Sequence, residues 1–360
     1  MKATEMPAYR LTSNCIWNSF QSSNKKHIII TGDRGSGKST LLNCLFPKPL
    51  PGITTWAVPK TAVYLKENST DNTTQVGFYD DTLAGLENKM RLCGDGFAKI
   101  GIDALNNALL SNAEWISIDE IGYLESQCTD YLNKIMDIMD KKHLLAVVRK
   151  QNLPHLKELC KREDVFLIDL DAPSGNTGCV IMASGLGKRF GENKLMAEFH
   201  GKPLISYVLD ATSDIFRKRI VVTRHEAIAN LCKERNIDFI LHTLPHRNDT
   251  IRLGLERFLD TEHCMFCTSD QPLLKQETIA ALALSAVNAP SKIIRPICED
   301  IIGSPVIFPK ITYDELLHLP DGKGGGYVIQ QHPDYVQYLP IRNLAELEDI
   351  DTPEDLLRLS

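Results

Sequence analysis

A glycine-rich loop with three basic residues follows a short apolar run in the middle of the 360-residue chain. The run at 179–182 is typical of a buried parallel strand. Glycines let backbone N–H groups approach a ligand, and successive N–H groups form a concave anion site. Arg189 and Lys194 add full positive charge, which suits a triphosphate because its charge must be neutralised before a nucleophile approaches. Four residues are expected to contact the nucleotide: Ala183, Ser184, Gly185 and Gly187.

Two common phosphate-binding motifs do not describe this loop. It lacks the Gly-Lys-Ser/Thr of a Walker A motif, and its G-x-G-x-x-x-G spacing departs from the dinucleotide-binding fingerprint. The open alternative is an ordinary glycine-rich turn whose basic side chains are solvated.

A Walker A motif does occur near the start of the chain. An apolar strand pattern at 27–31 leads directly into G-D-R-G-S-G-K-S-T at 32–40, and a helical pattern begins at Leu41. Strand, G-x-x-x-x-G-K-S loop and helix are the context of a P-loop. Lys38 would reach the β- and γ-phosphates, and the Ser39 hydroxyl would bind Mg²⁺. The expected nucleotide contacts are Gly32, Gly35, Gly37, Lys38, Ser39 and Thr40.

Two acids close the apolar strand expected at 115–118. At this position a P-loop protein holds Mg²⁺ through water, which is the role predicted for Asp119. Glu120 would orient or deprotonate the attacking water. The alternative is an ordinary strand end without a chemical role.

A second pair of acids is expected to hold Mg²⁺ in the second half. Asp270 closes the apolar strand at 264–268, on the same sheet edge as the glycine loop, because both follow strands of one parallel sheet. Asp351 precedes a helix start in which Thr352 and Asp355 form a capping box, so the cap leaves Asp351 free. Two carboxylates with phosphates are a usual Mg²⁺ ligand set.

Strand patterns alternate with helix patterns around all four acids, which predicts two doubly wound α/β sheets. A Pro/Gly/Ser/Asn cluster separates the two halves. The expected organisation is an extended N-terminal segment at 1–26, a P-loop domain at 27–171, a linker at 172–178 and a second domain at 179–360.

Composition narrows the class of protein. Hydrophobic residues make up 43% of the chain and charged residues 24%, as in ordinary globular proteins, and a net charge of −6 argues against a broad nucleic-acid-binding face. No apolar run predicts a membrane span or signal peptide. The ten cysteines are scattered, and the C-x-x-C at Cys264 and Cys267 lies in a strand pattern, which favours buried thiols over zinc. A reducing cytoplasm is therefore expected.

The stretch at 117–125, S-I-D-E-I-G-Y-L-E, resembles the small P-loop nucleoside-triphosphatase family of bacteria and archaea. The resemblance covers about 27–170, matches 51–98 only loosely, and implies ATP or GTP as a ligand. A nucleotide kinase is the rival, but kinases need several arginines to hold two sets of phosphates. Few arginines are available, among them Arg34, Arg91 and Arg149, which favours hydrolysis or nucleotide sensing.

Four motifs in order resemble the nucleotidyltransferases that complete the molybdenum cofactor, over about 178–360. They are the glycine loop, S-D-Q-P at 269–272, G-S-P at 303–305 and D-I-D-T-P-E-D at 349–355. Family members that use CTP tend to have Ala-Ala-Gly, Gly-Asp-x-Pro and Asp-Thr-Pro. This chain is more similar to them than to those using GTP, although Ser184 and Ser269 depart from the pattern.

The second resemblance implies a Rossmann-like domain that transfers CMP from CTP, or a nucleotide from GTP, to molybdopterin. Asp270 and Asp351 would hold Mg²⁺, while Arg189 and Lys194 would hold the leaving pyrophosphate. A molybdoenzyme would receive the product. Two alternatives remain open: a cytidylyltransferase for a sugar or polyol phosphate, and a P-loop switch whose second domain binds nucleotide without reacting. The segments at 303–305 and 321–326 either line the acceptor side or form surface loops.

Overall fold

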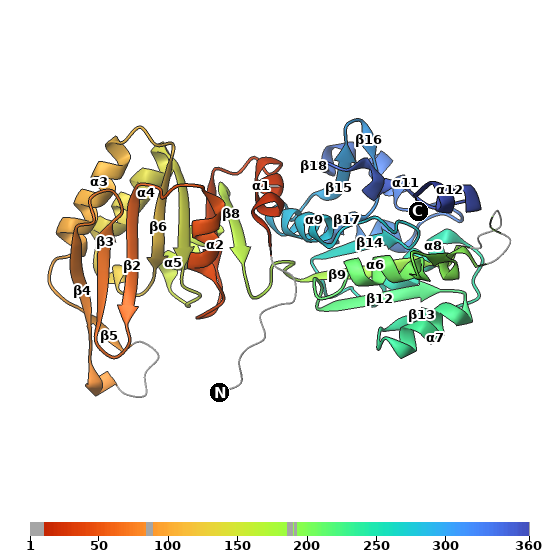
Figure 1. Ribbon diagram of the computed structural model, residues 1–360, viewed down its shortest axis with the longest axis horizontal. Helices are drawn as coiled ribbons and strands as arrows, with labels where there is room; N and C mark the ends of the chain where they lie inside the picture. Colours follow the sequence, from red (N-terminus) through yellow and green to blue (C-terminus); the bar gives the residue numbers. More distant parts are fainter. Residues whose placement is uncertain (1–10, 84–88, 186–189, 191–192, 360) are drawn as a thin grey trace. The chain divides into compact units, whose positions relative to one another are not determined.

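The computed structural model describes residues 11–83, 89–185, 190 and 193–359. The chain forms two compact units (Figure 1). The P-loop unit comprises residues 24–171, and the glycine-loop unit comprises the segment up to residue 23 together with 172–360. The P-loop unit is therefore inserted between the first helix and the rest of the glycine-loop unit.

The P-loop unit contains an eight-stranded sheet in the order β5-β4-β3-β2-β6-β7-β1-β8. Five neighbouring strands are parallel: β2 (Gly52–Val58), β6 (Trp115–Ile121), β7 (His143–Val148), β1 (His27–Thr31) and β8 (Val165–Asp169). The others extend one side as antiparallel strands: β3 (Ala62–Glu67), β4 (Thr73–Tyr79) and β5 (Met90–Leu92). This antiparallel extension coincides with the region that resembled the nucleoside-triphosphatase family only loosely.

Helices α2 (Lys38–Leu45), α3 (Ile102–Leu110), α4 (Thr129–Lys141) and α5 (Pro154–Lys161) accompany this sheet. The isoleucines of β1 are completely buried, as expected for a central parallel strand that is covered on both faces. The apolar run before the P-loop is therefore the strand that anchors it.

The glycine-loop unit contains a second sheet, in the order β13-β12-β9-β14-β17-β15-β16, with β18 beside β15. Its parallel strands are β13 (Phe239–Leu241), β12 (Lys218–Thr223), β9 (Thr177–Ala183) and β14 (His263–Thr268). The remaining strands are β17 (Val306–Pro309), β15 (Ile293–Cys298), β16 (Ile301–Ile302) and β18 (Val336–Pro340). A small hairpin pairs β10 (Glu198–Phe199) with β11 (Lys202–Pro203).

The helices of this unit are α1 (Ser13–Gln21), α6 (Ile205–Ala211), α7 (Glu226–Glu234), α8 (Arg247–Leu255), α9 (Gln276–Asn288), α10 (Tyr313–Leu317), α11 (Gly326–Gln331) and α12 (Pro353–Leu359). Both units thus combine a largely parallel sheet with helices, and the predicted α/β fold class is confirmed.

The N-terminal segment is not wholly extended, contrary to the prediction. Helix α1 packs on α9, with Cys15, Ile16 and Phe20 buried, and Ser19 Oγ donates to Ala281 O at 2.9 Å. The sequence alone missed this helix because its nine residues are mostly polar, and a helix this short is stable only through its packing. Strand β9 begins at Thr177, inside the stretch expected to be a linker.

The cysteines of the C-x-x-C segment are both buried in β14. Cys267 Sγ lies 3.9 Å from Cys179 Sγ of the adjacent strand β9. Within the described ranges, no cluster of three His, Cys, Asp or Glu side chains is placed to hold a metal ion. No helix in the same ranges is long and apolar enough to cross a membrane.

Candidate active sites

The P-loop joins the end of β1 to the start of α2. Gly37 adopts φ +93°, a left-handed conformation that favours glycine, immediately before the helix. Lys38 Nζ donates to Gly32 O at 2.8 Å and to Asp33 O at 2.7 Å. Burial lowers the pKa of Lys38 below its usual value. The ammonium group therefore lies over the loop that is expected to hold phosphate.

The acids at the end of β6 have different partners. Ser39 Oγ donates to Asp119 Oδ1 at 2.9 Å, which joins the two residues predicted to hold Mg²⁺. Asp119 is 8% exposed, and burial raises its pKa. Glu120 adopts φ +85°, and its carboxylate accepts a hydrogen bond from Arg149. The Arg149 contact was not predicted and shows that Glu120 carries a counter-ion.

Asp171, which the sequence placed at the domain boundary, contacts the P-loop directly. Its Oδ2 accepts from Asp33 N at 2.8 Å and from Lys150 Nζ at 3.0 Å. The sequence contained no motif that could have identified this contact. Thr40, also predicted to contact nucleotide, lies in the first turn of α2 and is exposed.

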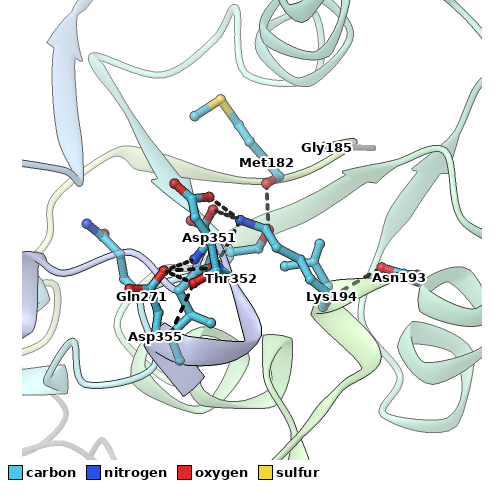
Figure 2. Close-up of polar contacts among 12 residues, drawn as sticks. Met182, Gly185, Asn193, Lys194, Gln271, Asp351, Thr352 and Asp355 are labelled. Carbon is cyan, nitrogen blue, oxygen red and sulfur yellow. Dashed lines mark hydrogen bonds and ion pairs between the residues drawn. The ribbon is translucent and has the colours of Figure 1, made fainter. Parts of the chain in front are cut away.

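Three side chains from distant segments meet in the glycine-loop unit. Lys194 Nζ donates to Asp270 Oδ2 and Asp351 Oδ1, both at 2.8 Å, and to Ile350 O at 3.0 Å (Figure 2). The side chain of Lys194 is 11% exposed and that of Asp270 is 20% exposed. Burial alone would lower the pKa of Lys194, but the charges and hydrogen bonds of Asp270 and Asp351 together raise it.

Local structure accounts for this convergence. Strands β9 and β14 end side by side, with Thr268 opposite Met182, and Ser269 Oγ donates to Met182 O at 2.8 Å. Ile350 is completely buried, and its N–H donates to Asp270 O at 2.9 Å. The buried isoleucine thus fixes the segment that carries Asp351 next to the end of β14.

The capping box predicted for the last helix is present. Asp355 N donates to Thr352 Oγ1 at 3.2 Å, and Thr352 N donates to Asp355 Oδ2 at 3.0 Å. The cap therefore satisfies the start of α12 and leaves Asp351 to face Lys194, as Figure 2 shows.

The carboxylates fit a hard divalent cation. Asp270 Oδ1 is buried and has no hydrogen-bond partner among the described residues. Oxygen donors of this kind suit Mg²⁺ or a similar ion. Burial, followed by the charges of Asp270 and Asp351, raises the pKa of Asp349 to about 6. More than a third of the surface of Asp349 remains exposed, so water moderates this effect.

Asp349 was not selected from the sequence, although a signal existed. Residues two apart in an extended segment project to the same side, so a buried Ile350 places both flanking aspartates together. Asp349 therefore lies near Asp270 and Asp351 and responds to their charges.

The described part of the glycine loop is tied to neighbouring strands. Ser184 Oγ donates to Val222 O at 3.1 Å and lies 2.9 Å from His242 Nε2, while Ala183 O accepts from Thr223 Oγ1 at 2.9 Å. The carbonyl of Gly185 contacts His225 Nε2 at 2.8 Å. Neither histidine was predicted. Gly187 and Arg189, which were predicted as nucleotide and pyrophosphate contacts, lie outside the described residues.

A cavity of about 380 Å³ lies next to the ends of β9 and β14 and is lined by Met182 and Phe266. Three basic residues also line it: Arg247, Arg295 and Lys323. Burial lowers the pKa of Arg295, and its Nε has no hydrogen-bond partner within the part of the chain that the structure describes. Ser304 and Gly324–Gly326 complete the wall, so both segments considered for the acceptor side line this cavity.

The glycine-loop unit is an α/β domain with a largely parallel sheet, and its glycine loop and two carboxylates lie at the carboxyl edge. In open α/β sheets this is the edge at which ligands bind. Residues 179–336 match the family model of the MobA-like NTP transferase domain. Residues 27–177 match the family model named NTPase. Both resemblances inferred from the sequence are thereby confirmed.

Individual proteins that resemble this chain match it at low sequence identity. A "Probable molybdenum cofactor guanylyltransferase" of Aquifex aeolicus is 28% identical over 102 residues, which are 28% of this chain and 49% of that protein. A protein with the same name from Natranaerobius thermophilus is 26% identical over 196 residues, which are 50% of this chain and 93% of that protein. The chain thus spans about half the length of the Aquifex relative.

Among solved structures, molybdopterin-guanine dinucleotide biosynthesis protein A of Archaeoglobus fulgidus is similar to this chain, with 24% identity and a TM-score of 0.40. The match covers 50% of this chain and 95% of that protein.

Proposed function

We propose that the glycine-loop unit is a nucleotidyltransferase that transfers a nucleoside monophosphate to the phosphate of molybdopterin. The observation that carries the proposal is the meeting of Lys194, Asp270 and Asp351 beside the end of β9. The match to the MobA-like NTP transferase model and the names of the relatives support the reaction type.

In the proposed reaction, an oxygen of the molybdopterin phosphate attacks the α-phosphorus of the nucleotide. The bond from the α-phosphorus to the bridging oxygen breaks, and pyrophosphate leaves. The protein needs no covalent nucleophile, because positioning the two anions and neutralising their charge removes most of the barrier.

Asp270 and Asp351 would hold Mg²⁺, which supplies Lewis-acid stabilisation of the transferring phosphate when bound. With Asp270 and Asp351 engaged by Mg²⁺, the ammonium group of Lys194 would be free to face the leaving pyrophosphate. Arg189 is proposed to share this role, and Gly185 and Gly187 to contribute backbone N–H groups. The cavity beside Met182, with its three basic residues, is proposed to receive the phosphorylated acceptor.

We propose CTP as the donor because Asp351-Thr352-Pro353 and Asp270-Gln271-Pro272 follow the pattern of the cytidylyltransferases. GTP is the competing donor, since the names of the relatives refer to guanylyl transfer. The P-loop unit is proposed to bind and hydrolyse ATP or GTP, with Ser39 and Asp119 on Mg²⁺ and Glu120 at the attacking water.

Pyrophosphate release tests the proposal. The full chain is incubated with Mg²⁺ and one NTP at a time, with and without molybdopterin, and labelled nucleotide in the pterin product is measured. We expect release that requires molybdopterin and is fastest with CTP. Faster release with GTP would correct the donor alone. Release with sugar or polyol phosphates instead would replace the acceptor, and no release with any acceptor would leave a P-loop switch as the function.

A further inference from the structure

A second cavity, of about 570 Å³, lies in the P-loop unit and has no role in the proposed reactions. Leu42 and Asn43 of helix α2, with Phe46 just after it, form one side of the cavity, and Thr54 and Lys66 of the β2–β3 hairpin form another. Figure 1 shows β3, β2 and β6 following one another across this part of the sheet. Cavities of this size hold small-molecule ligands.

The cavity adjoins the P-loop without overlapping its phosphate contacts. Leu42 and Asn43 lie three and four residues after Ser39 and thus on the same face of α2, about 5 Å further along the helix. On the hairpin side, Thr54 pairs in register with Asp119, the partner of Ser39. A ligand in the cavity would therefore lie next to the metal side of the P-loop.

The rim of the cavity is stiff. The connection from α2 to β2 reads F-P-K-P-L-P at 46–51, so three prolines fix φ and hold the preceding residues extended. Phe46 adopts the extended conformation, with φ −124° and ψ 141°. Such a connection cannot readily collapse into the space between α2 and β2.

The polar side of the cavity is ordered by Asn68. Its Oδ1 accepts from Thr54 Oγ1 at 2.8 Å, and its Nδ2 donates to Leu50 O at 3.1 Å and Ser117 Oγ at 3.3 Å. This network fixes the hydroxyl groups of Thr54 and Ser117, which line the same cavity as the apolar side chains of Leu42 and Phe46. A flat heterocycle with polar edges suits such a lining.

Two lysines supply the charge. Lys48 is exposed on the rim. Lys66 Nζ pairs with Asp71 Oδ1 at 2.6 Å, but the two side chains are 37% and 80% exposed. Exposed pairs of this kind contribute little free energy, so an anionic ligand can displace Asp71. Both ammonium groups are therefore available to a phosphate.

We propose that this cavity binds a phosphorylated heterocyclic compound of the size of a nucleoside monophosphate, as a second ligand of the P-loop unit. The apolar wall contacts the ring, the Thr54–Asn68–Ser117 side contacts its polar edge, and Lys48 with Lys66 holds the phosphate. The site is independent of the transfer reaction proposed for the other unit.

The test measures binding of 5′-GMP to the full chain by calorimetry, with the P-loop first saturated by a non-hydrolysable ATP analogue. We expect the unchanged protein to bind one GMP per chain at this site. The Lys48→Gln/Lys66→Gln variant should bind that GMP at least tenfold more weakly. Guanosine and inorganic phosphate should each bind more weakly than GMP. The matched control Lys141→Gln/Lys157→Gln, which changes two exposed lysines on α4 and α5, should bind as the unchanged protein does.

A second variant separates loss of the site from loss of folding. Asn43→Phe should fill the cavity and abolish the same GMP site, while NTP hydrolysis at the P-loop stays within about twofold, because Asn43 is exposed and lies one turn beyond Ser39. Unchanged GMP binding in both variants, or no GMP site in the unchanged protein, would overturn the proposal.

Discussion

The two lysines expected to contact phosphate differ in the charge of the groups that accept their hydrogen bonds. Lys38 rests on two neutral backbone carbonyls, and burial lowers its pKa. Lys194 rests on two carboxylates and one carbonyl, and its pKa is raised. The acceptors of Lys38 carry no charge, whereas displacement of Lys194 would leave Asp270 and Asp351 without this cationic partner.

The acidic residues of the two sites also differ in the charge of the groups that they contact. Of the two acids that end β6 in the P-loop unit, Asp119 accepts a hydrogen bond from a hydroxyl group, and Glu120 accepts one from a guanidinium group. In the glycine-loop unit two aspartates contact one ammonium group, and a third, Asp349, lies close enough for their charges to raise its pKa. We propose from this comparison that a nucleotide with its metal ion can bind the first site directly, whereas the second site requires a metal ion in place of Lys194 on the carboxylates.

The largest expected effect comes from separating the two sites. Asp270→Ala should lower nucleotidyl transfer at least about a thousandfold and leave NTP hydrolysis intact, because it removes a proposed metal ligand. Lys38→Ala should do the reverse. Both activities are measured on each full-length variant, with Asp260→Ala, an exposed acid paired with Lys218, as the control. Loss of both activities in one folded variant would contradict the two-site interpretation.

Lys194→Met tests cation exchange directly. Transfer should fall about a hundredfold because a group on the leaving pyrophosphate is lost. Without divalent ions the melting temperature should also fall, since Asp270 would keep a largely buried charge without a partner, at a cost of about 3 kcal/mol. Addition of Mg²⁺ should raise the melting temperature of this variant more than that of the unchanged protein. An equal rise in both would refute exchange; Lys202→Met, at an exposed pair, is the control.

A buried acid that forms no ion pair with any of the described residues sharpens the contrast between the sites. Burial raises the pKa of Glu125 to about 7, and Gly122 N donates to its Oε2 at 2.9 Å. The folded state therefore binds more protons than the unfolded state between about pH 4.5 and 7, so stability should fall as pH rises through this window, by about 3 kcal/mol in total. Glu125→Gln should remove this dependence. Hydrogen exchange of the β6 amides at pH 5 and pH 8 measures it, and a flat profile in the unchanged protein would contradict it.

The smallest expected effect concerns helix α1, which is separated in sequence from the rest of the glycine-loop unit. Ile16→Ala should destabilise the glycine-loop unit by about 2 kcal/mol, because it removes buried apolar surface between α1 and α9. Asn14→Ala, at an exposed position of the same helix, should change stability by less than about 0.5 kcal/mol. Thermal unfolding of both variants provides the measurement. Equal stability of the two would show that α1 is not part of the unit's core.

Much of the fold and part of the candidate site could be predicted from local sequence. The apolar runs of β1, β6 and β14 and the acids that follow them define strand ends, and the Thr352–Asp355 capping box depends on residues three apart. These features need no knowledge of distant contacts, since propensity, spacing and hydrogen bonding act within one turn or strand.

The features that were missed depend on distant partners. Glu120 of β6 accepts a hydrogen bond from Arg149, which follows the neighbouring strand β7. Asp171 accepts one from the backbone amide of Asp33 in the P-loop. The antiparallel strands β3, β4 and β5 were not identified from the sequence, because each is defined by its pairing with the neighbouring strand. The burial of α1 requires a helix more than 250 residues further along the chain. No local pattern encodes such pairings.

The separation of α1 from α9 has a consequence during synthesis. Helix α1 ends at residue 21 and α9 begins at 276, so about 255 residues must be translated before the two can meet. At about 5–20 residues per second this takes roughly 13–50 s, long enough for the intervening domain to fold on the ribosome. A nine-residue helix is marginal in water when alone. The nascent α1 segment is therefore expected to remain unfolded and sensitive to proteases until α9 has emerged from the ribosome.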